Sequence, residues 1–452
     1  MSEANELFKL LLSPLGMGAL ALAAAWFFLA GSYPILMWIG LGVTMYAASL
    51  QKFYDPFLES EWYPFLAPIE TLVQSGRPLS ILCLGALVGA SIVQGRWRGD
   101  LRPPAIMVPI HAIQVVLLGK MLMGAVSVSF VIQAALVYGL VATLGVVGVR
   151  SWLIGENSLR GPATALCTAV ALFCLLVEWQ LRVDPTAAIL NNGRLIGTCG
   201  NPQHAAVLLA ACLPGPLYFL AGGTSAGWRT KAGCVILLLS MLHLLVLTGS
   251  RTGAAMCAII FLLFFRRRII LLGCIGFVGF LAYSVIFPSP ENTSAFQNSA
   301  ESLLRLEDTR SHVWAAQWRT FLEHPVIGPP IVGERLGFGE NSWLALLATA
   351  GTAGLACLAW LLTLVVSSIA RLVRYQLAVE HPLAHVDFCL AGLIALFAGS
   401  FLEAYLLGII TLPILAILTY SAAADRFLEH TKEERSTPRP RKSAESVYSD
   451  VS

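Results

Sequence analysis

Charged side chains are scarce in this chain. Aspartate, glutamate, lysine and arginine together make up 12% of its 452 residues, whereas a soluble domain carries about 25%. A chain with so few charges cannot cover a globular surface with polar groups, which excludes a soluble globular protein. The net charge of +3 is too small to indicate nucleic acid as a partner.

Lysine is also scarce, and cysteine patterns typical of metal sites are absent. Only six of the 29 basic residues are lysine, a bias that either a GC-rich genome or a need for phosphate-binding arginine would explain. The ten cysteines lie almost entirely in apolar runs, where cysteine acts as a small hydrophobic residue. No CxxC or Cys/His spacing occurs, so the sequence predicts no metal and no cofactor.

Long apolar runs fill most of the chain, with a mean hydropathy of +0.74. Runs of about 17 residues or more are typical of membrane-spanning helices, and the alternation expected of barrel strands is absent. The sequence therefore predicts an all-α polytopic membrane protein with about 12 to 13 transmembrane helices. The expected spans are roughly 12–30, 33–50, 79–94, 103–118, 122–148, 161–181, 203–222, 232–248, 251–265, 269–287, 341–368, 385–402 and 405–423.

The chain divides into three parts. Residues 1–180 are N-terminal transmembrane helices, and residues 181–423 form a core with one long loop, 288–339, between late spans. Residues 424–452 are polar and predict a disordered cytoplasmic tail. Short basic loops such as 266–268 stay cytoplasmic, so the long loop is predicted to lie on the opposite side of the membrane.

Arginines stand in unusual settings in three of the outer segments. Arg194 lies in a glycine-rich run before a span, and Arg251 lies in a tight turn between two spans. Arg310 opens a helical-looking stretch of the long loop, which ends at His324-Pro325. For each arginine, a plain role in contacting headgroups or in a surface ion pair remains open.

Two glutamates stand at the outer ends of spans. Glu340 follows a glycine-rich run and directly precedes a span, so it is either a helix-capping residue favoured by the helix dipole or a reactive carboxylate. Glu403, between the last two spans, is either an outer-loop acid or a residue of the bundle. The outer loops contain no DxD motif, and the sequence predicts no clustered carboxylate pair there.

Five short blocks in this order resemble the O-antigen ligase and polymerase superfamily. Each block is weakly specific, but together they cover about residues 190–355 on one face of a polytopic protein. The blocks are Arg194…Gly197-Thr198…Gly200-Asn201-Pro202, Thr248-Gly249-Ser250-Arg251-Thr252-Gly253, Arg310…Trp314, His324-Pro325…Gly328 and Glu340-Asn341-Ser342…Gly351…Gly354.

The resemblance implies a membrane glycosyltransferase. Its donor would be a glycan on a polyprenyl pyrophosphate carrier, and its acceptor the hydroxyl of a glycan, lipid or protein. The reaction would need neither a nucleotide sugar nor a metal, and it would take place on the periplasmic side of a bacterial inner membrane. Whether the chain is a ligase or a polymerase stays open.

The resemblance also implies roles for individual residues. By position, Arg194, Arg251 and Arg310 would hold the pyrophosphate, with Asn201 and Asn341 as supporting residues. Glu340 stands where the family commonly has the histidine that is proposed to be the base. This departure leaves two catalytic candidates, Glu340 and His324.

Two other functions compete with a transferase. A transporter or flippase of lipid-linked saccharide would be expected to show inverted repeats and broken spans, and the sequence shows no convincing repeat. A scaffold protein would leave the arginines of the glycine-rich turns without a role. The sequence therefore favours the transferase.

Overall fold

The structure is a computed structural model. It describes residues 25–50, 72–73, 75–95, 101–153, 159–183, 185, 188–189, 193–222, 226–266, 310–332, 340–379, 383–409 and 411–436.

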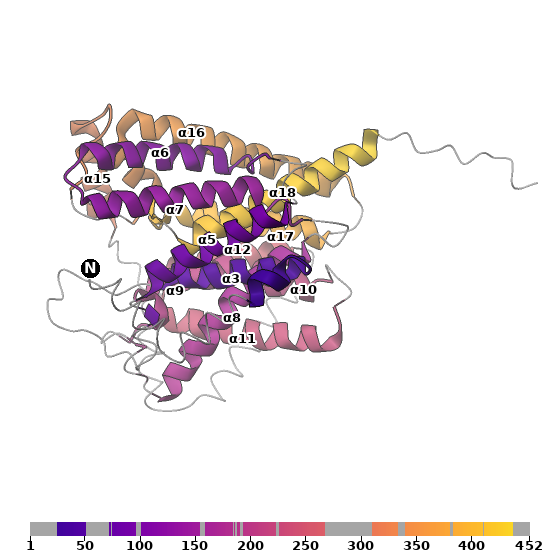
Figure 1. Ribbon diagram of the computed structural model, residues 1–452. Helices are drawn as coiled ribbons and strands as arrows, with labels where there is room; N and C mark the ends of the chain where they lie inside the picture. The colour runs from indigo at the N-terminus through magenta and orange to yellow at the C-terminus, as the bar shows by residue number, and fades with distance from the viewer. Residues whose placement is uncertain are drawn as a thin grey trace, which may run out of the picture.

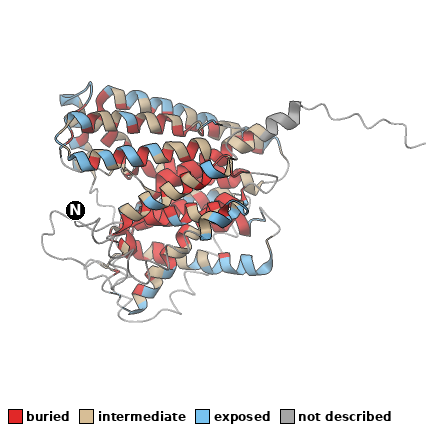
Figure 2. Cartoon of the chain, in the orientation of Figure 1, coloured by how far each residue is buried: buried red, intermediate tan, exposed pale blue. Residues whose placement is uncertain are grey.

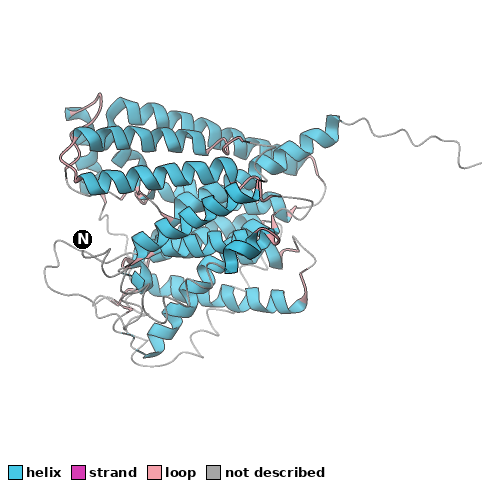
Figure 3. Ribbon diagram, in the orientation of Figure 1, coloured by secondary structure: helices cyan, strands magenta, loops and turns pink. Residues whose placement is uncertain are grey.

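The described part of the chain is all-α, as predicted. It contains thirteen α-helices and two short 3-10 helices, η3 and η4, joined by loops (Figures 1 and 3). Their bounds are α3 Pro34–Ser49, α5 Gly76–Gln94, α6 Met107–Met123, α7 Val128–Val147, α8 Arg160–Val183, η3 Gly197–Cys199, α9 Pro202–Cys212, α10 Pro214–Leu220, α11 Trp228–Thr248, α12 Arg251–Phe264, α15 Ser311–Glu323, α16 Ser342–Leu377, α17 Ala384–Ser400, η4 Tyr405–Leu407 and α18 Leu412–Ser436.

Most of the predicted spans coincide with these helices. Eleven of the thirteen match α3, α5, α6, α7, α8, α9 with α10, α11, α12, α16, α17 and α18. The spans predicted at 12–30 and 269–287 lie mostly or wholly outside the described residues. The helical stretch predicted after Arg310 is α15.

The helices form a polytopic membrane protein. Six segments are long and apolar enough to cross a membrane: α5, α7, α8, α11, α16 and the combined α9 and α10, and four shorter helices are also apolar. Large apolar side chains point outward from these helices, for example Val128 at 74% exposed and Ile236 at 69% exposed. Soluble proteins rarely expose extensive apolar surface, so this surface faces lipid.

The centre of the bundle is made of α9, α17 and the first half of α18. Nearly every residue of these segments is buried, as the red interior of Figure 2 shows. α17 packs against α12, α16 and α18, while α3 packs against α5 and α8. A helix that is apolar all round is suited to such a central place, and the outer helices present one face to lipid.

The span predicted at 405–423 begins too early. Residues 405–411 instead form η4 and a turn, and α18 follows. The Ser342 hydroxyl donates to the Glu403 carbonyl at 2.6 Å and accepts from the Leu406 N–H at 3.3 Å. These contacts hold the backbone at Glu403 and Leu406 against the start of α16.

The tail predicted at 424–452 also begins too early, because α18 continues past residue 424. The Ala105 N–H donates to Asp425 Oδ2 at 2.8 Å, and Arg150 Nη2 lies 2.8 Å from Glu429 Oε2. The two carboxylates are four residues apart and share one face of α18. These contacts hold the helix against the ends of α6 and α7.

A glycine lets the loop after α15 dock into α16. Gly351 has φ 59° and ψ −142°, which kinks α16. The Thr352 N–H then donates to the Pro325 carbonyl at 2.8 Å. A Cβ atom on Gly351 would lie 2.6 Å from that same carbonyl oxygen.

Gly351→Ala is therefore expected to destabilise the protein by about 1–3 kcal/mol from backbone strain alone. Thermal unfolding in detergent measures the loss. Gly119→Ala is the matched control, because Gly119 lies inside α6 and a Cβ atom added there would meet nothing within 4 Å. The control should be neutral or slightly stabilising. Equal stability of both variants would contradict the strained kink.

Candidate functional site

Several chain segments that are distant in sequence meet at one end of the bundle. The Leu195 N–H donates to the Leu247 carbonyl at 2.8 Å, which joins the segment before η3 to the end of α11. The starts of α9, α12, α15 and α16 and the connection from α17 to α18 lie nearby. The basic residues predicted to mark the cytoplasmic side lie elsewhere: Arg266, at the other end of α12, pairs with Asp387. These polar segments and Arg266 thus occupy opposite ends of α12.

The turn between α11 and α12 leaves the side chain of Arg251 exposed and buries that of Thr252. Gly249 ends α11 with φ 57°, a left-handed conformation that glycine adopts at little cost. Ser250 caps α12, since its Oγ accepts from the Gly253 N–H at 3.3 Å. Arg251, the first residue of α12, is exposed, whereas Thr252 is buried.

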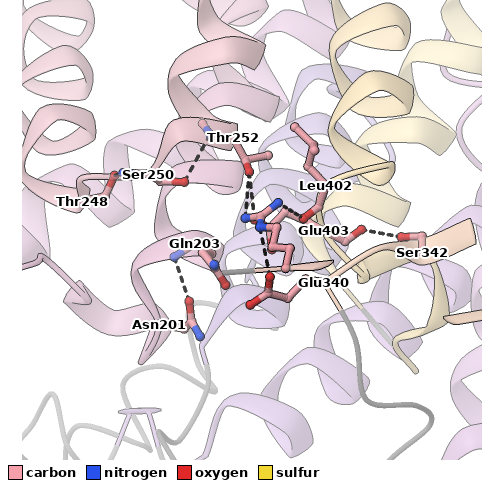
Figure 4. A network of polar contacts seen from close by, with 11 residues as sticks. Asn201, Gln203, Thr248, Ser250, Thr252, Glu340, Ser342, Leu402 and Glu403 are labelled. Carbon is pink, nitrogen blue, oxygen red and sulfur yellow. Dashed lines mark hydrogen bonds and ion pairs between the residues drawn. The ribbon is translucent and has the colours of Figure 1, made fainter. Parts of the chain in front are cut away.

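Arg310 joins three of these segments. Its Nη1 donates to the Leu402 carbonyl at 2.5 Å, and its Nη2 donates to Thr252 Oγ1 at 3.3 Å. It also forms two ion pairs, from Nη2 to Glu403 Oε1 and from Nε to Glu340 Oε2, each at 3.0 Å. Figure 4 shows Thr252, Leu402, Glu403 and Glu340 converging around this centre. A forked guanidinium is suited to bonding several acceptors at once.

Glu403 is a buried carboxyl group, with the residue only 5% exposed. Besides Arg310, the Thr252 hydroxyl donates to its Oε1 at 3.0 Å. Burial raises the pKa of Glu403 to about 7, Arg310 and Thr252 act in the opposite direction, and the Glu340 carboxylate raises it further. Near neutral pH this carboxyl group is therefore poised between its protonated and ionised forms.

The three arginines predicted from the sequence lie close to one another. Arg194 is half-buried, and its Nε donates to the Thr248 carbonyl at 2.9 Å. Burial lowers the pKa of Arg194, the Glu403 carboxylate raises it, and the charges of Arg251 and Arg310 lower it. The charges of Glu403, Arg251 and Arg310 thus all act on Arg194.

Both predicted supporting asparagines are helix caps. The Asn201 Oδ1 accepts from the Gln203 N–H at 2.8 Å and caps α9, while the Asn341 Oδ1 accepts from the Trp343 N–H at 2.8 Å and caps α16. Since Asn341 fills the capping position, Glu340 precedes the cap and its side chain turns to Arg310 instead. Besides capping α9, Asn201 also lines a cavity.

This cavity has a volume of about 420 Å³. Glu340 and Glu403 line it, together with Asn201 and His204 from the start of α9 and Val313 from α15. Its size lies within the range of small-molecule sites, about 300–1,000 Å³. The cavity thus brings two carboxylates and several neutral polar groups to the arginine-rich end of the bundle.

His324, the second predicted catalytic candidate, does not lie with these residues. It is exposed, it follows the last residue of α15, and it is not among the residues that line the cavity. Its N–H donates to the Thr320 carbonyl at 3.1 Å, and its carbonyl accepts from the Gly328 N–H at 3.0 Å. These contacts are those of a residue that ends a helix.

Sequence reasoning missed the pairing of Glu340 with Glu403. The sequence predicted no clustered carboxylate pair, yet both glutamates contact Arg310. Glu403 is 93 residues from Arg310 in the chain, so spacing alone could not reveal the contact. The one usable signal was an acid placed between two apolar spans, where an unpaired charge is costly.

Four of the residues named by the family resemblance, Arg194, Arg251, Arg310 and Glu340, come together at this end of the bundle. The geometry alone establishes a multi-span helical membrane protein with an arginine- and carboxylate-containing site at one end. No family model matches the chain, and no curated protein matches it.

Proposed function

We propose that this protein is a membrane glycosyltransferase that moves a glycan from a polyprenyl pyrophosphate carrier to an acceptor hydroxyl, as a ligase or polymerase of surface polysaccharide. The observation that carries the proposal is the contact of Arg310 with two carboxylates that line one cavity, with Arg194 close by. Cationic donors and potential bases are thus found within a single site.

The chemistry requires both kinds of group. As the bond from the anomeric carbon to the pyrophosphate breaks, negative charge develops on the leaving oxygen, and fixed guanidinium donors stabilise it. The acceptor hydroxyl must lose a proton, which a carboxylate within hydrogen-bond reach can accept. Arg194, Arg251 and Arg310 supply the donors, and the carboxylates beside Arg310 supply the base.

The position of the site also fits a lipid-linked substrate. The cavity lies at the ends of apolar helices, with α3, α9 and α18 contributing to its wall. A polyprenyl chain can therefore remain in the bilayer while its pyrophosphate reaches the arginines. This arrangement requires that the site end face the periplasm, the orientation predicted from the basic loops.

The test is transfer by the purified full-length chain in lipid. The donor is polyprenyl-pyrophosphate-linked oligosaccharide extracted from cells that make this protein, and total membrane lipid of the same cells is added as a further acceptor. We expect release of free polyprenyl pyrophosphate together with a larger glycan or a glycosylated lipid, with and without chelator. Donor binding without any release, under both acceptor conditions, would refute the transferase and favour a transporter.

A further inference from the structure

Glu403 stands between the arginines and the cavity. On one side its carboxylate contacts Thr252 and Arg310, and it acts electrostatically on Arg194. On the other side it lines the cavity, which Arg194 and Arg310 do not. A leaving group held by the arginines and a ligand in the cavity would therefore meet at Glu403.

The carboxylate of Glu403 is held by one oxygen. Its Oε1 accepts from Thr252 Oγ1 and from Arg310 Nη2, each at 3.0 Å. Its carbonyl is fixed by the Ser342 hydroxyl at 2.6 Å. Within the described part of the chain, the hydrogen bonds to this carboxylate all reach Oε1 and leave Oε2 for a ligand. A rigidly placed carboxylate with one oxygen left for a new partner is the geometry that proton transfer requires.

The remainder of the cavity is suited to a saccharide. Hydroxyl and amide side chains line it, namely Ser49, Thr411, Gln203 and Asn201, alongside the imidazole of His204. Such groups donate and accept hydrogen bonds without demanding a charged partner, which matches a ligand rich in hydroxyl groups. Apolar neighbours such as Val207 and Leu412 complete the wall.

From this placement, and resting on the proposed function, we infer that Glu403 rather than Glu340 accepts the proton of the acceptor hydroxyl, and that the acceptor sugar occupies the cavity. The acceptor oxygen forms a bond to the anomeric carbon as its proton passes to Glu403 Oε2. The bond from the anomeric carbon to the pyrophosphate breaks, and its electron pair leaves with the pyrophosphate oxygen. Glu403 afterwards returns its proton to water.

Glu340 then has a positioning role. Its Oε2 lies 3.0 Å from Arg310 Nε, so it holds the guanidinium that in turn holds Glu403. It also raises the pKa of Glu403 by like-charge repulsion. The other charged or titratable groups that act on Glu403 are Arg310 directly before α15, Arg194 before η3 and Tyr405 in η4.

The experiment compares Glu403→Gln, Glu340→Gln and Glu323→Gln in the full-length chain. Release of polyprenyl pyrophosphate is measured from pH 5 to 9 with the extracted donor described above. Glu323 is an exposed carboxylate at the end of α15 and serves as the matched control. Glutamine at position 403 can still accept from Thr252 and Arg310, so the site keeps its shape.

We expect Glu403→Gln to lose about 10²–10⁴-fold in kcat with little change in the KM for the donor, because the arginines remain. Glu340→Gln should stay within about 10-fold of wild type. The rising limb of its pH–activity profile should lie at lower pH than that of wild type, because removing the Glu340 charge lowers the pKa of Glu403. Glu323→Gln should behave like wild type.

A larger loss of kcat in Glu340→Gln than in Glu403→Gln, or equal losses in the two variants, would overturn the assignment of Glu403 as the base. If Glu403→Gln fails to fold, the pH profiles of wild type and Glu340→Gln decide, since an unshifted profile contradicts the role of Glu403. If wild-type protein releases nothing with either acceptor, the proposed function itself fails.

Discussion

Replacing Arg310 with alanine is expected to lower glycan transfer by about 10²–10³-fold or more and to destabilise the fold as well. The activity falls because a guanidinium donor to the leaving group is lost. The fold is weakened because two carboxylates, Glu340 and Glu403, lose the same counterion. Removing one partner of a buried ion pair typically costs about 3–5 kcal/mol.

The loss of stability in Arg310→Ala should depend on pH. Burial has already raised the pKa of Glu403 to about 7, and loss of the arginine raises it further. Because the folded-state pKa then lies above the unfolded value, the unfolding free energy of the variant falls as the pH rises through the window between them. Relative to wild type, the deficit near pH 6 should reflect only the lost contacts to Glu340 and Leu402, and it should grow above about pH 7, where only the wild-type Glu403 carboxylate is ionised and paired.

Unfolding in detergent at pH 6 and pH 8, with transfer measured in parallel, tests this prediction. Arg319→Ala is the matched control, since Arg319 lies on the exposed face of the same helix, α15. Arg310→Lys should recover part of the stability and little of the activity, because an ammonium cannot bond several acceptors in one plane. A pH-independent loss of stability in Arg310→Ala would show that Glu403 is not ionised by this contact.

The spans could be predicted from the sequence because each corresponding helix contains a long apolar run. No partner is needed to recognise such a run, and eleven predicted spans coincide with helices. Several predicted ends differ from those of the helices, for example α16, which continues to Leu377, and both ends of the last span. Ser342 bonds the backbone at Glu403 and Leu406 and delays the start of α18, and Arg150 pairs with Glu429 and prolongs it. Both are tertiary contacts from distant segments, which hydropathy does not record.

Only some residues of the candidate site could be recognised from the sequence. The arginines stood out because glycine-rich turns at the ends of spans are unusual places for a charge. Glu403 did not stand out, since its significance comes from Arg310, 93 residues away, and from burial that raises its pKa to about 7. His324 was conspicuous in sequence, yet it does not line the cavity. Residue type and position drew attention to the arginines, while the pairing of the acids required the fold.

Replacing Arg251 with alanine is expected to separate function from stability. Arg251 is exposed at the first position of α12, so its removal should lower the unfolding free energy much less than the removal of Arg310 does. If it contacts the pyrophosphate as proposed, transfer should nevertheless fall by about 10²–10³-fold. The loss should appear mainly in kcat, because charge on the leaving oxygen increases in the transition state.

Arg229→Ala is the matched control for Arg251→Ala. Arg229 is also exposed, but it lies near the start of α11, at the end opposite to the turn that carries Arg251. It should have wild-type activity if the basic end is cytoplasmic and the site end periplasmic. Comparable losses in the two variants would indicate a general effect of surface charge on the lipid-linked donor. A loss confined to Arg251→Ala, with unchanged unfolding, places the pyrophosphate at the turn between α11 and α12, because a structural role for this arginine would have lowered the unfolding free energy as well.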